Sequence, residues 1–121
     1  MLSRDNLDSS AELLRVLGLA VRLELVVTLV DGEHSVGEID SRTGIGQPGL
    51  SQQLAVLRKA DLVTARREAK QVFYSLNRGP LERLGQFFAA ISGSRDQREA
   101  AGDPLLDTGG AAVFARVTPR G

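Results

Sequence analysis

Residues 47–76 constrain the fold of this chain more than any other stretch, because a short helix is followed there at once by a hairpin. Pro48 suits the first position of a helix, where its missing N–H costs little, and helical apolar spacing continues to about residue 60. Residues 62–67 and 71–76 are rich in Val, Thr, Phe and Tyr and flank a turn, which predicts two strands. This order predicts the second helix of a helix-turn-helix, followed by a wing.

The predicted helix at residues 48–60 has two different faces. At about 100° per residue, Leu50, Leu54 and Leu57 fall on one stripe, which predicts the side that faces the core. The opposite face carries Pro48, Gln52, Ala55 and Lys59, with Ser51 on the flank. Slim polar groups of this kind suit a helix in the major groove of DNA, because Gln can pair with adenine and Ser with a base or a phosphate. The alternative is a solvated amphipathic helix beside a charged turn.

Charge is distributed unevenly along a chain whose formal net charge is zero. Residues 1–46 hold 4 Lys/Arg and 8 Asp/Glu, a net charge of −4, whereas residues 47–78 hold 6 and 2, a net charge of +4. Residues 79–121 are balanced, with 5 of each sign. The positive segment is where a polyanion would bind, and its Lys and Arg side chains could neutralise phosphates.

Three helices are predicted before this stretch. After a flexible N-terminus at residues 1–9, apolar residues at helical spacing predict a first helix from Ser10 to about Gly18. Residues 20–30 predict a second helix, which is apolar on nearly all sides and is therefore expected to be the buried central helix. Residues 35–38 fit a capping box, which opens a short third helix that ends before the turn at Gly44 and Gly46.

A fifth helix is predicted after the hairpin, starting at residues 78–80, and it carries an apolar stripe of four residues. The stripe consists of Leu81, Leu84, Phe88 and Ile91.

We expect residues 10–93 to form one domain and residues 94–121 to be a disordered tail. The predicted fold is a mainly α, α+β winged helix-turn-helix, in the order helix, helix, helix, helix, strand, strand, helix.

The composition excludes several classes of function. The chain has no Cys, which excludes disulfides and thiol chemistry, and its one His, His34, cannot form a His-rich metal site within one chain. A lone His in a loop is typically solvated. The alternatives are that His34 contributes to a site shared across a dimer, or that it is an axial ligand of haem. We expect no enzyme, catalytic residue, metal or cofactor. No apolar run approaches the about 18 residues of a membrane span and the N-terminus is mixed in charge, so we expect a cytoplasmic protein.

Several motifs resemble those of the ArsR/SmtB family of bacterial winged-helix repressors. LRKADLV at residues 57–63 resembles the family's LR-x-AGLV, and RREAKQVFYSL at residues 66–76 resembles its wing. GLAVRLELV at residues 18–26 is similar to the start of the family's second helix. The resemblance covers roughly residues 11–92, and GQPGLSQQL at residues 46–54 most resembles the branch that includes sulfide- and persulfide-responsive repressors.

The resemblance implies a homodimer that represses transcription from a palindromic operator and is released by an inducer. Dimerisation also follows from physics, because one small helix reads only a few base pairs and useful specificity needs two half-sites. The expected interface lies on the first and last helices, at Leu13, Leu17, Leu81, Leu84, Phe88 and Ile91. The expected DNA contacts are Gln47, Pro48, Ser51, Gln52, Lys59, Arg66, Arg67 and Lys70.

The chain also departs from the family pattern. The persulfide-sensing branch has a Cys in the second helix where this chain has Val27, so any inducer must act without a thiol. Ala69 replaces the Gly of the wing turn, and because Ala at positive φ costs about 1 kcal/mol, a different turn is predicted. Pro48 and Gly49 replace hydroxyl residues that often contact DNA. These departures leave a second hypothesis, a winged-helix protein-interaction module that no longer reads DNA.

Overall fold

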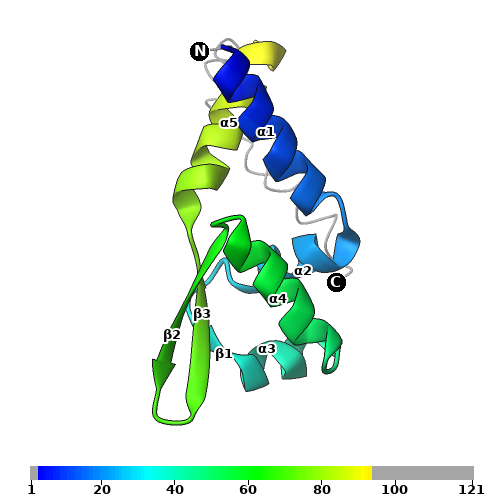
Figure 1. Cartoon of the computed structure of the whole chain (residues 1–121), viewed down its shortest axis with the longest axis vertical. Coiled ribbons are helices and arrows are strands. Elements are labelled where there is room, and N and C mark those ends of the chain that lie inside the picture. The colour runs from blue at the N-terminus through cyan, green and yellow to red at the C-terminus, as the bar shows by residue number, and fades with distance from the viewer. Residues whose placement is uncertain (1–2, 94–121) are drawn as a thin grey trace, which may run out of the picture. The chain divides into compact units, whose positions relative to one another are not determined.

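A computed structural model describes residues 3–93 (Figure 1), so the predicted tail at residues 94–121 lies outside the described residues. Two compact units divide at Gly85, and the last helix therefore begins in the larger unit, Leu2–Gly85, and ends in the smaller one. The observed order confirms the predicted winged helix-turn-helix and adds one strand. The elements are α1 (Arg4–Leu17), α2 (Ala20–Thr28), β1 (His34–Ser35), α3 (Val36–Thr43), α4 (Gly49–Lys59), β2 (Val63–Glu68), β3 (Gln71–Leu76) and α5 (Arg78–Ser92).

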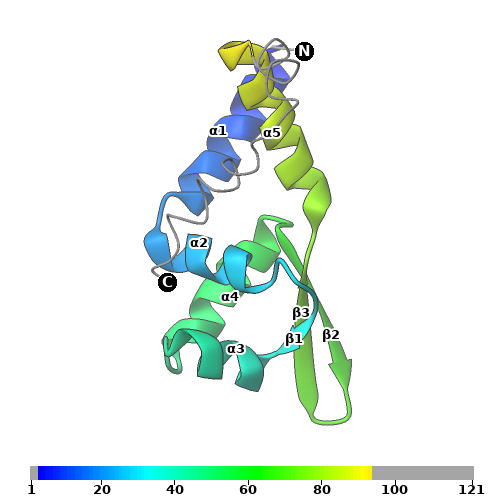
Figure 2. The same cartoon turned by 180° about the vertical axis from the view of Figure 1, so that it is seen from behind.

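The helix-turn-helix consists of α3 and α4, which are joined by a tight turn (Figure 2). The predicted capping box is confirmed, because the Glu38 backbone N–H donates to Ser35 Oγ at 3.1 Å and the Ser35 N–H donates to Glu38 Oε1 at 2.9 Å. Gly44 ends α3 at a φ of 70°, a left-handed conformation that favours glycine. The Gly46 N–H donates to Asp40 Oδ1 at 2.9 Å, which fixes the direction in which α4 leaves the turn.

The sheet has three antiparallel strands in the order β1-β3-β2, of which the sequence predicted only β2 and β3. The two-residue strand β1 pairs His34 with Tyr74 and Ser35 with Phe73. Two residues are too few to show the alternation of apolar and polar side chains by which a strand is recognised. Its pairing with β3 attaches the base of the hairpin to the segment that starts α3.

Aliphatic side chains from several elements form the core of the larger unit. The predicted inner stripe of α4 is confirmed, because Leu50, Leu54 and Leu57 are fully buried. Each fully buried aliphatic side chain contributes about 1.5–3 kcal/mol relative to an exposed one, so this stripe holds α4 firmly in place. In the described part of the chain, the other buried aliphatic residues are Val16, Leu17, Leu25, Leu29, Ile39, Leu62, Val63 and Leu84.

The first helix begins at Arg4, so the prediction that it starts at Ser10 is wrong. Ser3 is the N-cap, and its Oγ accepts a hydrogen bond from the Asn6 backbone N–H at 3.2 Å. Asp5 in the first turn also favours a helix start, because a negative charge is stabilised at the positive end of the helix dipole. Residues 4–9 are mostly polar, and apolar spacing alone could not detect a helical turn that is exposed on all sides.

Helix α2 ends at Thr28, and it is not the buried central helix that was predicted. Leu25 is its only buried residue, whereas Leu23 is 49% exposed and Val27 is 63% exposed. Leu19 and Val30, next to the helix ends, are also exposed, and with Leu23 and Val27 they follow helical spacing. A strongly apolar helix reveals that it needs a partner surface, but not whether this surface belongs to the same fold.

Candidate nucleic-acid interface

The outer face of α4 is open to solvent along its whole length. Pro48, Ser51, Gln52 and Lys59 are all exposed, as is Ala55 between them. This face carries small and polar groups and no large apolar side chain, as the sequence predicted. Such a helix can approach the edges of base pairs closely.

The glutamines on α4 and just before it differ in their hydrogen bonds. Gln53 accepts a hydrogen bond from Arg22 Nε at 2.9 Å, which ties α4 to α2. Gln47 Oε1 accepts from the Ser51 backbone N–H at 3.0 Å, so this side chain satisfies an otherwise unpaired donor in the first turn of α4. Within residues 3–93, the Gln52 amide and the Ser51 hydroxyl make no hydrogen bond to other protein groups, which leaves both available to a ligand.

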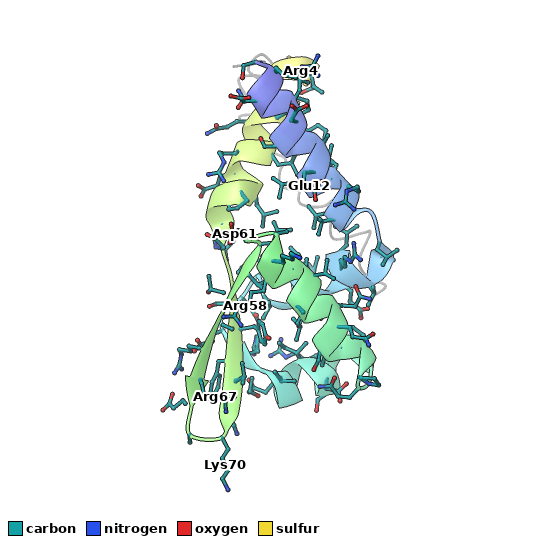
Figure 3. The ribbon with its side chains drawn as sticks, in the orientation of Figure 1. Arg4, Glu12, Arg58, Asp61, Arg67 and Lys70 are labelled. Atoms are coloured by element: carbon teal, nitrogen blue, oxygen red, sulfur yellow. The ribbon has the colours of Figure 1, made fainter. Side chains whose placement is uncertain are left out.

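The wing turn corrects one expectation about Ala69. Glu68 pairs with Gln71, so Ala69 and Lys70 form a two-residue hairpin loop. Ala69 has a φ of 58°, and a positive φ at the first central residue alone is the pattern of a type II′ turn, where Gly is usual. The prediction of a different turn is therefore wrong: the glycine-type conformation is kept with Ala in it. The Lys70 side chain extends from this turn away from the strands (Figure 3).

The basic residues of the wing lie on two different faces. Arg67 follows Val63 and Ala65 at alternate positions, so it belongs to the face of β2 whose base is buried against the core. Arg66 follows Thr64 on the opposite, exposed face. Among the described residues Arg67 and Lys70 make no ion pair, and the same holds for Lys59 at the end of α4. These three cations are available to phosphates.

Arg66 is held by two carboxylates. Its Nε and Nη2 donate to the two oxygens of Glu33 at 2.7 Å and 2.9 Å, and its Nη1 donates to Glu68 Oε1 at 2.6 Å. Its guanidinium carbon also lies 4.7 Å from the centre of the Phe73 ring. These hydrogen bonds raise the pKa of Arg66, and the bond from Arg66 lowers the pKa of the Glu33 carboxyl.

Sequence reasoning missed both acidic partners of Arg66. Glu68 lies two positions after Arg66 in the same strand, so strand alternation could have placed the two side chains on one face. Glu33 is 33 residues away in sequence and comes next to Arg66 only through the pairing of β1 with β3. No local pattern signals that contact.

His34 is not the solvated loop residue that its isolation in the sequence indicated. Its side chain is only 12% exposed, with Nε2 2.9 Å from Asp31 Oδ1 and Nδ1 3.4 Å from Glu38 Oε1. The hydrogen bond to His34 is the main cause of a lowered pKa at Asp31. His34 therefore joins the loop before β1 to the first turn of α3. In the described part of the chain, no three His, Cys, Asp or Glu side chains are grouped as metal ligands would be.

The residues expected at a dimer interface differ in burial. Leu17 and Leu84 are buried in the core of the larger unit, and Leu13 and Leu81 pack partly buried against it. A partner contact for these four stays a prediction, since they already stabilise their own unit. Phe88 and Ile91, by contrast, are 44% and 56% exposed.

None of the helices in residues 3–93 combines the length and apolar character needed to cross a membrane.

The fold and this surface define a winged helix-turn-helix protein. The family described as "Bacterial regulatory protein, arsR family" matches residues 20–65. The biofilm growth-associated repressor of Xylella fastidiosa (strain Temecula1) is 54% identical over 74 residues, which cover 61% of this chain and 65%, just under two thirds, of that relative. Its namesake from Agrobacterium fabrum is 51% identical over 81 residues, 67% of this chain and 69% of the relative.

A solved structure gives the same assignment. The crystal structure of the transcriptional repressor BigR from Xylella fastidiosa matches with a TM-score of 0.58 and 45% identity, over 74% of this chain and 96% of that one. The chain therefore belongs to the ArsR family of bacterial regulatory proteins, which confirms the resemblance seen in its motifs. Members of this family are transcriptional regulators and not enzymes.

Proposed function

We propose that this protein is a sequence-specific DNA-binding transcriptional repressor, which acts in the cytoplasm as a homodimer and leaves a palindromic operator in response to a non-thiol signal. One observation carries the proposal: the exposed polar face of α4 stands beside a hairpin whose Arg67 and Lys70 have no carboxylate partner among the described residues. Family membership supports the same conclusion.

In this proposal, the exposed polar residues of α4 contact the edges of the DNA bases. Within residues 3–93 the Gln52 side-chain amide makes no hydrogen bond, so it can pair in two places with adenine, and a pair of this kind discriminates against other bases by about 1–3 kcal/mol. Ser51 would contact a base or a phosphate from the flank of the helix. Gln47 and Pro48 precede α4, where the positive end of the helix dipole favours phosphate.

In this proposal, the DNA phosphates are bound by Lys59, Arg67 and Lys70. All three are exposed and make no ion pair within residues 3–93, so they can approach phosphates without first releasing a carboxylate. Such contacts strengthen binding to every DNA sequence and make it sensitive to salt, because each one releases condensed counterions.

The homodimer is supported by exposed apolar side chains. The exposed residues on α2 and at its ends follow helical spacing, and an exposed apolar stripe on a soluble protein usually marks an interaction surface. We propose that α2 contributes to the interface together with α1 and α5, because Leu23 and Val27 on α2 are among the most exposed apolar residues. Among residues 3–93, the exposed large apolar residues are Leu7, Leu14, Leu19, Leu23, Val27, Val30, Phe88 and Ile91.

The signal for release cannot act on a thiol, because the chain contains no Cys. Val27 occupies the position at which the resemblance indicated a sensing Cys, and its side chain is 63% exposed. An apolar residue there can contact an organic ligand but cannot form a persulfide. We therefore propose a non-thiol inducer for this protein.

A footprint on the promoter of its own operon tests the proposal. We expect protection of two half-sites about one helical turn apart, and loss of protection when the inducer is added. Gln52→Ala should reduce the preference for the operator over a scrambled duplex by about five- to a hundredfold. Arg67→Gln should weaken binding to both duplexes alike, whereas Arg4→Gln in α1 should change neither.

The protein-interaction alternative makes the opposite prediction. A wild-type protein that shows no salt-sensitive binding to its promoter, and that purifies with another protein, would favour this alternative and contradict the proposed repressor.

A further inference from the structure

The ion-pair cluster around Arg66 spans the whole sheet. Arg66 on β2 lies opposite Phe73 on β3, and Phe73 lies opposite Ser35 on β1. Glu33, two residues before Ser35, receives two hydrogen bonds from the guanidinium. The Arg66 side chain therefore passes over the Phe73 ring and joins the first strand of the wing to the segment that leads into β1. We call Glu33, Arg66 and Phe73 the wing clamp.

Two members of the wing clamp, Arg66 and Phe73, lie with Ser35 in the last row of the sheet that has three strands, whereas Glu33 precedes β1. Strand β1 pairs only with Phe73 and Tyr74, so the hairpin beyond this row consists of β2 and β3 alone. Arg67 and Lys70 both lie in this outer, two-stranded part. An isolated two-stranded hairpin is only marginally stable in water, so its direction depends on how its base is fixed.

The charge of the cluster argues against a phosphate contact by Arg66. One guanidinium faces the two carboxylates of Glu33 and Glu68, which leaves a net charge of −1. A phosphate would have to displace a carboxylate that already forms a bidentate, charge-assisted pair, and the second carboxylate would repel it. Arg67 and Lys70 face no such competition within the described chain.

We propose that Arg66 is a positioning residue of the wing: with Glu33 it holds the base of the hairpin so that Arg67 and Lys70 meet the DNA backbone in a fixed direction. This inference rests on the proposed DNA-binding function. Fixing the wing before binding lowers the entropy cost of ordering it on the DNA.

Glu33→Gln tests the proposal through the sign of its effect on DNA affinity. The substitution makes the protein more positive, so electrostatics alone predicts tighter binding to DNA. Loss of the wing clamp predicts weaker binding to the operator, by about three- to tenfold. Glu24→Gln on α2 removes the same charge outside the clamp and should not weaken binding. Arg66→Lys keeps the charge but loses the bidentate fork, so it should behave like Glu33→Gln.

The salt dependence of binding separates positioning from phosphate contact. Arg67→Gln should reduce the slope of log K against log salt by about 0.9 per protomer, since it removes one phosphate contact. Arg66→Gln should weaken binding and leave the slope unchanged. Tighter binding by Glu33→Gln, or an equal loss of slope in the two Arg variants, would overturn the proposal.

A measurement without DNA separates this inference from the proposed function. Glu33→Gln should speed amide hydrogen exchange at residues 67–72 in the free protein, while the α4 amides that pack on the core keep their wild-type rates. Unchanged exchange at residues 67–72 would also overturn the wing clamp. If the wild-type protein bound no operator, the proposed function would fail, and the exchange rates would still decide whether the clamp exists.

Discussion

Ala69→Gly should stabilise this protein, although it removes a methyl group and adds chain flexibility. Ala69 has a φ of 58°, in the left-handed region, where a Cβ costs about 1–2 kcal/mol. Glycine avoids this cost but loses about 0.4–1 kcal/mol through the greater freedom of the unfolded chain. The difference is a net stabilisation of about 0.5–1 kcal/mol. For a domain of this size, the melting temperature should rise by about 3–6 °C.

Ala55→Gly is the matched control, because the chemical change is the same and the backbone is different. Ala55 lies exposed inside α4, where glycine costs about 0.5–1 kcal/mol relative to alanine. Urea unfolding, followed by circular dichroism at one protein concentration, should therefore move the two midpoints in opposite directions. Equal or lower stability of Ala69→Gly would refute the strain assigned to this turn.

Two further predictions concern the start of α3 and the acidic side chains near it. Ser35→Ala should lower the free energy of unfolding by about 1 kcal/mol, because it removes the acceptor of the capping box, whereas Ser41→Ala on the exposed side of the same helix should have little effect. Hydrogen bonds lower the pKa values of Asp31, Glu33 and Glu38 in the folded state, so their stabilisation is present above the pKa of the unfolded chain and is lost as the pH falls through the folded values. Urea midpoints between neutral and acidic pH should show this loss, and Glu33→Gln should reduce it; a pH dependence unchanged by that substitution would contradict the assignment.

Local patterns predicted most of the helix-turn-helix and of the wing. The capping box at Ser35 and Glu38 depends on residues three apart, and the buried stripe of α4 depends on residues three and four apart. The strand alternation of the hairpin is equally local. In each case, the residues that show the pattern are the same residues that make the contact, so the sequence alone is sufficient to predict that contact.

Contacts between distant residues could not be predicted in this way. Strand β1 exists because His34 and Ser35 pair with β3, almost forty positions later in the chain. The burial of α2 was overestimated for a related reason, since hydrophobicity does not tell which surface will cover a residue such as Val27. Sequence periodicity identifies the face that needs a partner, and only the tertiary structure identifies that partner.

A contact between distant residues also changes how many positive charges of residues 47–78 are free to bind DNA. By sequence, residues 47–78 carry a net charge of +4, but Arg66 in that segment is paired with Glu33 from the acidic part of the chain. If Lys59, Arg67 and Lys70 each contact one phosphate, a dimer makes about six contacts and the slope of log K against log salt is about −5. If Arg66 adds a contact, the slope becomes about −7. A salt titration of operator binding by the wild-type protein therefore measures whether the charge counted along the sequence or the charge left free by folding determines DNA binding, and a slope near the steeper value would contradict the wing clamp.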